Sequence, residues 1–283
     1  KPLWDLGLSL PNQGDVDPQS ISGAVGTSTH GTGKDLTSLS SVPTEIRLVD
    51  AQGNVHECSA DENPDLFNAA RCAMGTCGVF TEMTLQCVPA YGLKGRQWLE
   101  PLDKVLAEID HRRATHRHFE FWMFPYSDHA LVKILDETDE LPPVQPEADQ
   151  PFLSEDFLMK MASELVGLFP SLNEPLQQRL DSFMDPTNYY GPAFQVFPSP
   201  RDVRFNEMEY QVPADKGPEA IMAVRDAIRK AAIPVAFPME YRYVKADDVW
   251  LSPFEGLDAA SISVHRYHKE DFKPLYELTE PIL

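Results

Sequence analysis

The sequence predicts an α+β fold, in which helices cover one face of a largely antiparallel sheet. Two patterns lead to this prediction: segments of alternating apolar and polar residues, typical of half-buried strands, and helical segments placed between them. The chain has 283 residues, of which 42% are hydrophobic and 24% are charged. This globular composition and length favour two modest domains over one.

The first third of the chain predicts a small sheet with one helix. Residues 45–58 alternate around a turn at 50–54, which is typical of a β-hairpin. A short helix is expected at 64–72, and a strand at 79–88. Residues 89–92 have the composition of a boundary between domains.

The remaining two thirds predict a second unit with a long insertion. One helix and two strands are expected at 102–113, 118–124 and 130–135. Residues 136–200 contain ten prolines around helical pieces at 155–168 and 176–183, which indicates an insertion lying over another part of the protein, for instance as a lid. Regular elements return as strands at 205–212, 235–244 and 261–268 and a helix at 217–232.

Both ends of the chain predict a fragment. The sequence starts with Lys1, and a periodic apolar segment follows at once. At the other end, the amphipathic helix expected at 272–283 has no C-terminal glycine or cap. No signal peptide or membrane-spanning segment is seen. A cytoplasmic location is therefore the default expectation.

Charge and cysteine content exclude several classes of protein. The formal net charge is -20, which repels nucleic acid and anionic lipid surfaces. The chain lacks the paired clusters of a zinc site, so we predict no metal site. The cysteines are interpreted as buried free thiols, with a metal site or a disulfide as the alternative; they are Cys58, Cys72, Cys77 and Cys87.

Residues 14–33 are the most informative segment, because glycine, serine and threonine dominate them. Glycine lets backbone amides approach a ligand, and hydroxyls can donate to a phosphate without adding charge. The spacing fits neither a phosphate-binding Walker loop nor the G-x-G-x-x-G fingerprint of dinucleotide folds. On composition alone, a surface loop remains the alternative.

The sequence of residues 14–33 resembles the flavin-binding segment of the vanillyl-alcohol-oxidase (PCMH-type) FAD family. The resemblance is strongest to its branch of D-arabinono-1,4-lactone, L-gulonolactone and alditol oxidases. Two further segments carry the same resemblance, in the same order. Residues 78–91 resemble the strand that closes the FAD domain, and residues 239–253, with Met-Glu-Tyr-Arg and Asp-Asp-Val-Trp-Leu-Ser-Pro, resemble the substrate-domain signature.

The resemblance implies FAD as cofactor and a set of residues along its path. Asp15 stands where the family can carry Ser, and Val79 is expected to touch the cofactor through its backbone. The expected cofactor-binding residues are Asp15, Ser20, Gly23, Thr27, Ser28, Thr29, His30, Gly31 and Val79.

Glu240 and Arg242 form the candidate catalytic pair. They are two residues apart in an alternating strand, so both side chains leave the same face. A solvated cross-strand ion pair would show the same spacing. The resemblance implies instead that Arg242 holds a substrate oxygen or stabilises negative charge on the reduced flavin, while Glu240 orients Arg242 and accepts a bond from a substrate hydroxyl.

His265 is the third candidate. It lies in the strand expected at 261–268, where the family places a polar residue in contact with substrate, and an imidazole there binds or relays a proton from a hydroxyl. A histidine satisfied by ordinary core or surface hydrogen bonds is the alternative.

The resemblance implies the second half of a PCMH-type FAD domain (1–91), followed by an α+β substrate or cap domain (92–283) with an antiparallel sheet and a helical insertion. The expected activity is FAD-dependent oxidation of a sugar-1,4-lactone, with oxygen or another electron acceptor. An alditol oxidase and a non-catalytic binding module are the alternatives. A loop that grips the pyrophosphate and a His-Trp-Gly-Lys motif are not found, so the fragment itself is expected to bind flavin weakly or not at all and to be inactive.

Overall fold

The computed structural model describes residues 1–145, 155–179, 184–198 and 203–283. Its α-helices are α1 (Pro2–Asp5), α2 (Ile21–Gly26), α3 (Pro64–Ala70), α4 (Leu102–Thr115), α5 (Glu155–Leu168), α6 (Asn173–Gln177), α7 (Ala193–Val196), α8 (Gly217–Ala231) and α9 (Lys273–Thr279). Its 3-10 helices are η1 (Leu39–Ser41), η2 (Pro170–Leu172) and η4 (Glu280–Ile282). Its strands are β1 (Leu8–Ser9), β2 (Pro43–Val49), β3 (Val55–Ser59), β4 (Val79–Leu85), β5 (Val88–Pro89), β6 (Gly92–Pro101), β7 (His118–Met123), β8 (His129–Thr138), β9 (Thr187–Pro192), β10 (Phe205–Pro213), β11 (Met239–Val244) and β12 (Ala259–Tyr267).

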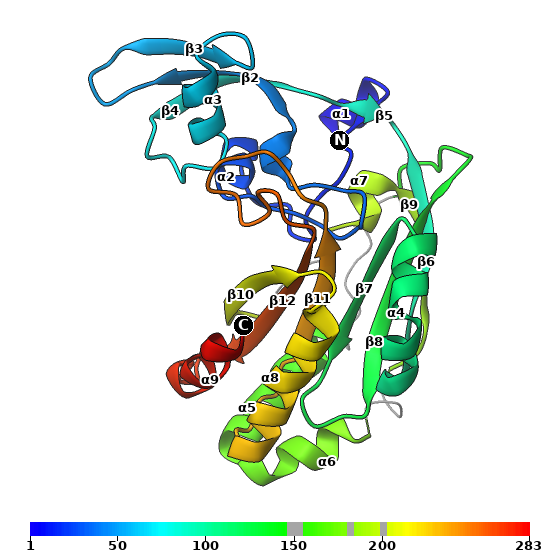
Figure 1. Ribbon diagram of the computed structural model, residues 1–283. Helices are drawn as coiled ribbons and strands as arrows, with labels where there is room; N and C mark the ends of the chain where they lie inside the picture. Colours follow the sequence, from blue (N-terminus) through cyan, green and yellow to red (C-terminus); the bar gives the residue numbers. More distant parts are fainter. Residues whose placement is uncertain (146–154, 180–183, 199–202) are drawn as a thin grey trace.

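The strands form one large and one small sheet, joined by a two-stranded ribbon of β1 and β5 (Figure 1). The small sheet has the order β3-β2-β4, and the large antiparallel sheet has the order β10-β12-β11-β7-β8-β6-β9. Every strand of the large sheet lies between residues 92 and 267, whereas the small sheet lies between residues 43 and 85.

The apolar core lies between the large sheet and helices α4 and α8, which cover one face of it (Figure 1). Helix α8 contributes Ile221, Val224 and Ile228, spaced three and four residues apart so that they form one apolar stripe. Phe121 and Tyr241 stack from adjacent strands, with ring centroids 4.7 Å apart. Helices on one face of an antiparallel sheet are what the sequence predicted.

Most predicted elements agree with the structure, but three expectations need correction. The strand predicted at 235–244 begins only at Met239, because Pro234 and Pro238 lack the N–H that a ladder requires. Strand β6 was not predicted. Part of the predicted insertion, β9, pairs with β6 and extends the large sheet, so the insertion is not only a cover.

Two smaller expectations concern the insertion and the thiols. Helix α5 has the predicted bounds, whereas the helix predicted at 176–183 is present only as α6, and residues 180–183 lie outside the described residues. All four cysteines are free thiols, of which Cys58 and Cys72 are buried and the other two are half-buried.

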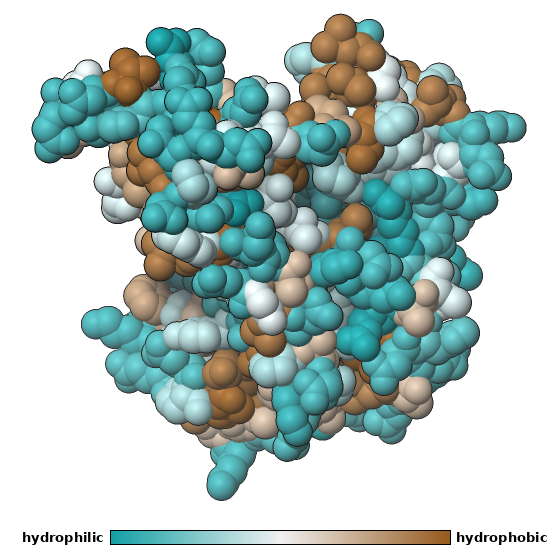
Figure 2. Space-filling model, turned by 45° about the horizontal axis from the view of Figure 1, so that its top comes forward, coloured by the Kyte–Doolittle hydropathy of each residue, from teal (hydrophilic) through white to brown (hydrophobic). Residues whose placement is uncertain are grey.

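The face drawn in Figure 2 is largely hydrophilic, and a hollow separates its two upper projections. None of the helices in the described ranges combines the length and the apolar character that crossing a bilayer requires.

Candidate active site

The face of the large sheet that points away from α4 and α8 is polar. Along an antiparallel pair, residues opposite each other project to the same side. Glu240 is opposite Ser263, and Ser263 is also opposite Glu209 on the next strand. Three adjacent strands thus share one polar surface, formed by Glu207, Glu209 and Gln211 of β10, Ser261, Ser263 and His265 of β12, and Glu240 and Arg242 of β11.

Arg242 lies at the centre of this polar face, among three carboxylates. Its Nε and Nη2 donate to Oε1 of Glu240 at 2.9 and 2.5 Å, and Nη2 also donates to Oδ2 of Asp15 at 3.0 Å. Its Nε lies 3.3 Å from Oε2 of Glu120. Arg242 and Glu240 are only 7% and 4% exposed, so they are not the solvated ion pair that their spacing alone allowed.

The same burial shifts the proton affinities of this pair. Burial raises the pKa of Glu240 to about 7; Arg242 opposes this shift, and the charges of Asp15 and Glu120 add to it. For Arg242, burial lowers the pKa, but the surrounding carboxylates raise it by more, so the net pKa lies well above its usual range. Arg242 is therefore a permanent cation.

Glu120 and Lys133 extend this network to two further strands, and sequence analysis did not single them out. Lys133 Nζ lies 3.4 Å from Oε1 of Glu120 and 5.2 Å from the centroid of the Tyr189 ring. A cavity of about 10 Å³, the size of one water, adjoins Lys133, Glu120, Asp15 and Arg242. The sequence did hold a signal for these two residues: each is a charged residue inside a predicted strand that is otherwise mostly apolar, at 118–124 for Glu120 and at 130–135 for Lys133.

His265 is held on the same polar face, close to Glu207. Its Nδ1 lies 2.9 Å from the backbone oxygen of Pro238, and its Nε2 lies 3.3 Å from Oε1 of Glu207. Burial lowers the pKa of His265, but the hydrogen bond and charge of Glu207 raise it by more, so the net pKa is raised. The structure thus brings Glu240, Arg242 and His265 onto one face.

His30 connects the glycine-rich segment to the edge strand β10. Its Nε2 lies 3.0 Å from Oε1 of Glu209. The same carboxylate accepts hydrogen bonds from Gln211 through Oε1 and from Ser263 through Oε2. Burial lowers the pKa of His30, yet the charge of Glu209 and its hydrogen bond raise it by more. For Glu209, burial raises the pKa, but the charge of His30 and its hydrogen bond bring it far below its usual value. Glu209 was not predicted as a site residue.

The other expected cofactor-binding residues fall into two groups. An exposed group lies around α2: the Ser20 hydroxyl caps the helix by accepting from Gly23 N at 3.1 Å, and Thr27 and Thr29 lie beside it. A buried group faces the protein interior. Ser28 lies 2.9 Å from the Ser40 hydroxyl, and a Cβ on Gly31 would lie 2.2 Å from the Gln13 carbonyl.

Gly31 is therefore required by packing within the protein. Val79 begins β4, which lies at one end of the small sheet's order, so the outer side of its backbone has no strand partner among the described residues. The structure does not place Val79 beside Arg242.

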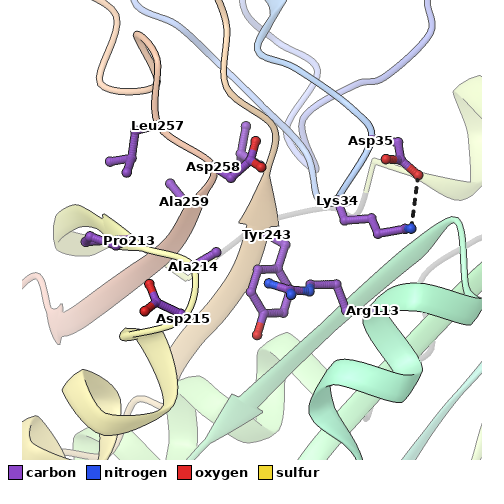
Figure 3. Close-up of a pocket in the computed structure, with 11 residues that line it drawn as sticks. Lys34, Asp35, Arg113, Pro213, Ala214, Asp215, Tyr243, Leu257, Asp258 and Ala259 are labelled. Atoms are coloured by element: carbon purple, nitrogen blue, oxygen red, sulfur yellow. Dashed lines mark ion pairs between the residues drawn. The ribbon is translucent and has the colours of Figure 1, made fainter.

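A separate hollow of about 450 Å³ lies next to the end of β11 (Figure 3). The Arg113 guanidinium covers the Tyr243 ring, 4.6 Å from its centroid, and Lys34 and Asp258 also line the hollow. Tyr243 leaves β11 on the opposite face from Arg242, so this hollow does not belong to the polar site. Its mixed charges indicate no particular class of ligand.

Comparison with known proteins identifies the family. Residues 83–283 match the model of a family described as D-arabinono-1,4-lactone oxidase. The chain belongs to this family. The resemblance seen in the sequence is thereby confirmed.

Individual relatives agree with this assignment, and one solved structure shares the fold. L-gulono-1,4-lactone dehydrogenase of Mycobacterium tuberculosis is 37% identical over 98% of this chain, and L-gulonolactone oxidase of Bos taurus is 27% identical over 92%. The chain spans 64% and 60% of the lengths of these relatives. A solvent-stable cholesterol oxidase, only 14% identical, superposes over 99% of this chain and 64% of its own with a TM-score of 0.73, which shows that the fold is shared.

Proposed function

We propose that the protein containing this chain oxidises a sugar-1,4-lactone with FAD as cofactor. The observation that carries the proposal is the buried Arg242, held by Glu240 on the sheet and by Asp15 from the glycine-rich segment. This contact joins the polar face to the segment that resembles a flavin-binding loop. The relatives are named for gulono- and arabinono-lactones, which favours a lactone over an open-chain alditol.

The residues present fit FAD by the chemistry of their donors. Ser20, Thr27 and Thr29 place hydroxyls on an exposed surface at α2. The chain has a net charge of -20, and hydroxyl groups can donate hydrogen bonds to a pyrophosphate without requiring further cations. We assign the holding of FAD to these residues, to the backbone of Gly23 and to the open edge at Val79. When bound, FAD would supply the acceptor for a hydride from the substrate carbon.

The polar face supplies binding and orientation of the substrate, and the Glu240 carboxylate would take the hydroxyl proton as the hydride leaves the substrate carbon. Arg242 holds a substrate oxygen, and its permanent charge stabilises negative charge that develops beside it. Glu240 accepts a hydrogen bond from the substrate hydroxyl and keeps Arg242 in place. His265, fixed through Nδ1, contacts a second hydroxyl through Nε2.

The first test is an absorbance spectrum of the purified full-length protein, recorded before and after a sugar-1,4-lactone is added without oxygen. We expect flavin bands that bleach on addition and return when oxygen or another electron acceptor is admitted. A protein without flavin bands would contradict the proposal. Bleaching by alditols but not by lactones would assign the substrate to the open-chain class.

A further inference from the structure

Glu207, Glu240 and His265 bring three potential metal ligands together on the polar face. Each offers one ligand atom, and these atoms all lie within 4.8 Å of one another. The residues come from the adjacent strands β10, β11 and β12, and Glu207 is directly opposite His265 in the ladder. The sheet therefore fixes the spacing of their backbones. We propose that these three residues bind a divalent transition-metal cation of the Zn²⁺ class.

The imidazole of His265 is oriented for such a role. Its Nδ1 is fixed at the Pro238 carbonyl, 2.9 Å away, and the ring of Phe205 packs edge-on against it at 5.0 Å. The other ring nitrogen, Nε2, is thereby directed at the carboxylates of Glu207 and Glu240. A backbone carbonyl on the far nitrogen is the usual way in which a metal-binding histidine is held.

The distances within the cluster agree with a zinc-sized site. Bonds of about 2.0–2.1 Å to nitrogen and oxygen place two ligands of a tetrahedral zinc ion about 3.3 Å apart. His265 Nε2 and Glu207 Oε1 are already 3.3 Å apart. Glu240, within 4.8 Å of both, needs only a small movement to complete three ligands.

Glu240 keeps one oxygen available for a metal ion. Both of its hydrogen bonds from Arg242 go to Oε1, and among the described residues no hydrogen bond reaches Oε2.

The charge of the polar face also favours a cation. Among the described residues, five carboxyl side chains are gathered there with two basic side chains, Arg242 and Lys133, both of which contact these carboxyl groups. The carboxylates are Asp15, Glu120, Glu207, Glu209 and Glu240. The side chain of Glu207 is 40% exposed, which gives an ion a path from solvent.

Three protein ligands leave a fourth position for water. Because Glu240 and His265 are also the residues assigned to the substrate hydroxyls, the metal ion and the lactone would compete for them. The site goes beyond the proposed oxidation, which uses no metal ion.

The experiment uses Co²⁺ alone as a spectroscopic probe, added to the full-length protein without lactone. We expect visible ligand-field absorbance that saturates with Co²⁺ and disappears when Zn²⁺ is added. Glu207→Gln removes one ligand at a half-exposed position, and should weaken Co²⁺ binding by at least about tenfold, since even residues outside the ligand shell change metal affinity 10–100-fold. Glu219→Gln, at an exposed glutamate of α8, is the matched control and should bind Co²⁺ like the parent.

Two results would overturn the proposal: no ligand-field absorbance at millimolar Co²⁺, or equal affinities for the parent and Glu207→Gln. Circular dichroism of both variants would show that they remain folded. Since the measurement needs no turnover, its outcome is independent of whether the protein oxidises a lactone.

Discussion

At the scale of single residues, Arg242 is a buried cation with three carboxylate partners. Its planar guanidinium reaches Glu240, Asp15 and Glu120 simultaneously. A lysine ammonium is a single point charge and cannot make the paired contact with Glu240 while also reaching the others. The identity of this residue, and not only its charge, should therefore matter.

We expect Arg242→Lys to lower kcat/KM for the lactone by about 10²–10³-fold in the full-length protein, because a preorganised donor at the reacting oxygen is lost. Steady-state kinetics would measure this. Arg225→Lys, which alters a pair with Asp226 on α8, on the other side of the sheet from Arg242, is the control and should leave kcat/KM unchanged. A parent-like kcat/KM for Arg242→Lys would contradict the role given to Arg242.

His118 gives a prediction about pH and stability. It is 1% exposed, its Nδ1 lies 2.7 Å from the Thr32 oxygen, and its Nε2 accepts from Arg117. Burial lowers its pKa to about 3; the Thr32 bond opposes this, and the charge of Arg117 adds to it. The folded state therefore holds the neutral ring, whereas the unfolded chain takes up a proton near pH 6.5.

Because the folded pKa is depressed, His118 contributes its full stability above pH 6.5 and loses it as the pH falls toward 3. The loss amounts to roughly 4–5 kcal/mol over that window. Urea unfolding at pH 7 and pH 5 should show a smaller drop in the free energy of unfolding for His118→Gln than for the parent. Equal drops in both proteins would exclude this histidine as the cause.

The sequence was sufficient to propose Glu240, Arg242 and His265, because alternation places Glu240 and Arg242 on one face of a strand and the family resemblance implies a role for all three. It was not sufficient for Glu120, Lys133 or the other residues that reach the site only through strand order and register. The spacing of Glu120 and Lys133 along the chain says nothing of their adjacency across β7 and β8.

At the scale of elements, helix α8 packs against the sheet through a glycine. A Cβ on Gly217 would lie 2.1 Å from the Tyr241 hydroxyl and 2.4 Å from the Ala260 Cβ. The close approach of α8 to β11 and β12 thus depends on the missing side chain.

We expect Gly217→Ala to reduce the free energy of unfolding by about 1–3 kcal/mol, as overpacking of a core usually does. Gly167→Ala in α5 is the matched control. There a Cβ would meet only Glu270 Oε1 at 3.5 Å, and alanine should stabilise the helix by up to about 1 kcal/mol. Thermal unfolding of the two variants should therefore shift in opposite directions.

Elements with clear periodicity were predictable, and α5 agrees with the sequence to the residue. Strand β6 was not, because Gly92 and Gly95 interrupt its alternation and its two partners come from later in the chain. Gly95 is nevertheless suited to its place, since a Cβ there would lie 2.0 Å from the Ile134 carbonyl. The local pattern carries no sign of such a cross-strand requirement.

At the scale of the whole molecule, Thr32 connects the glycine-rich segment to the large sheet. Its hydroxyl donates to the Phe119 carbonyl at 2.7 Å and accepts from Tyr243 N at 3.2 Å. The next residue, Gly33, donates to the Tyr243 carbonyl at 2.7 Å. The segment that supplies Asp15 and His30 is thus fastened to β7 and β11.

We expect Thr32→Val to cost about 1–3 kcal/mol, because a buried N–H at Tyr243 and a carbonyl at Phe119 lose their partner. Hydrogen exchange of the Tyr243 amide should become faster. Thr44→Val, at an exposed threonine of β2, is the control. An unchanged exchange rate in Thr32→Val would show that the two parts are held together elsewhere.

Strand β11 is six residues long, and its two faces serve opposite purposes. Inserting or deleting one residue ahead of Glu240, while the flanks stay in register, would turn Glu240 and Arg242 into the layer covered by α8 and turn Tyr241 toward the polar face. Point substitutions change one face at a time, whereas a change of length exchanges both. Sequences that keep this chemistry should therefore align across residues 239–244 without a gap, however far their composition has diverged.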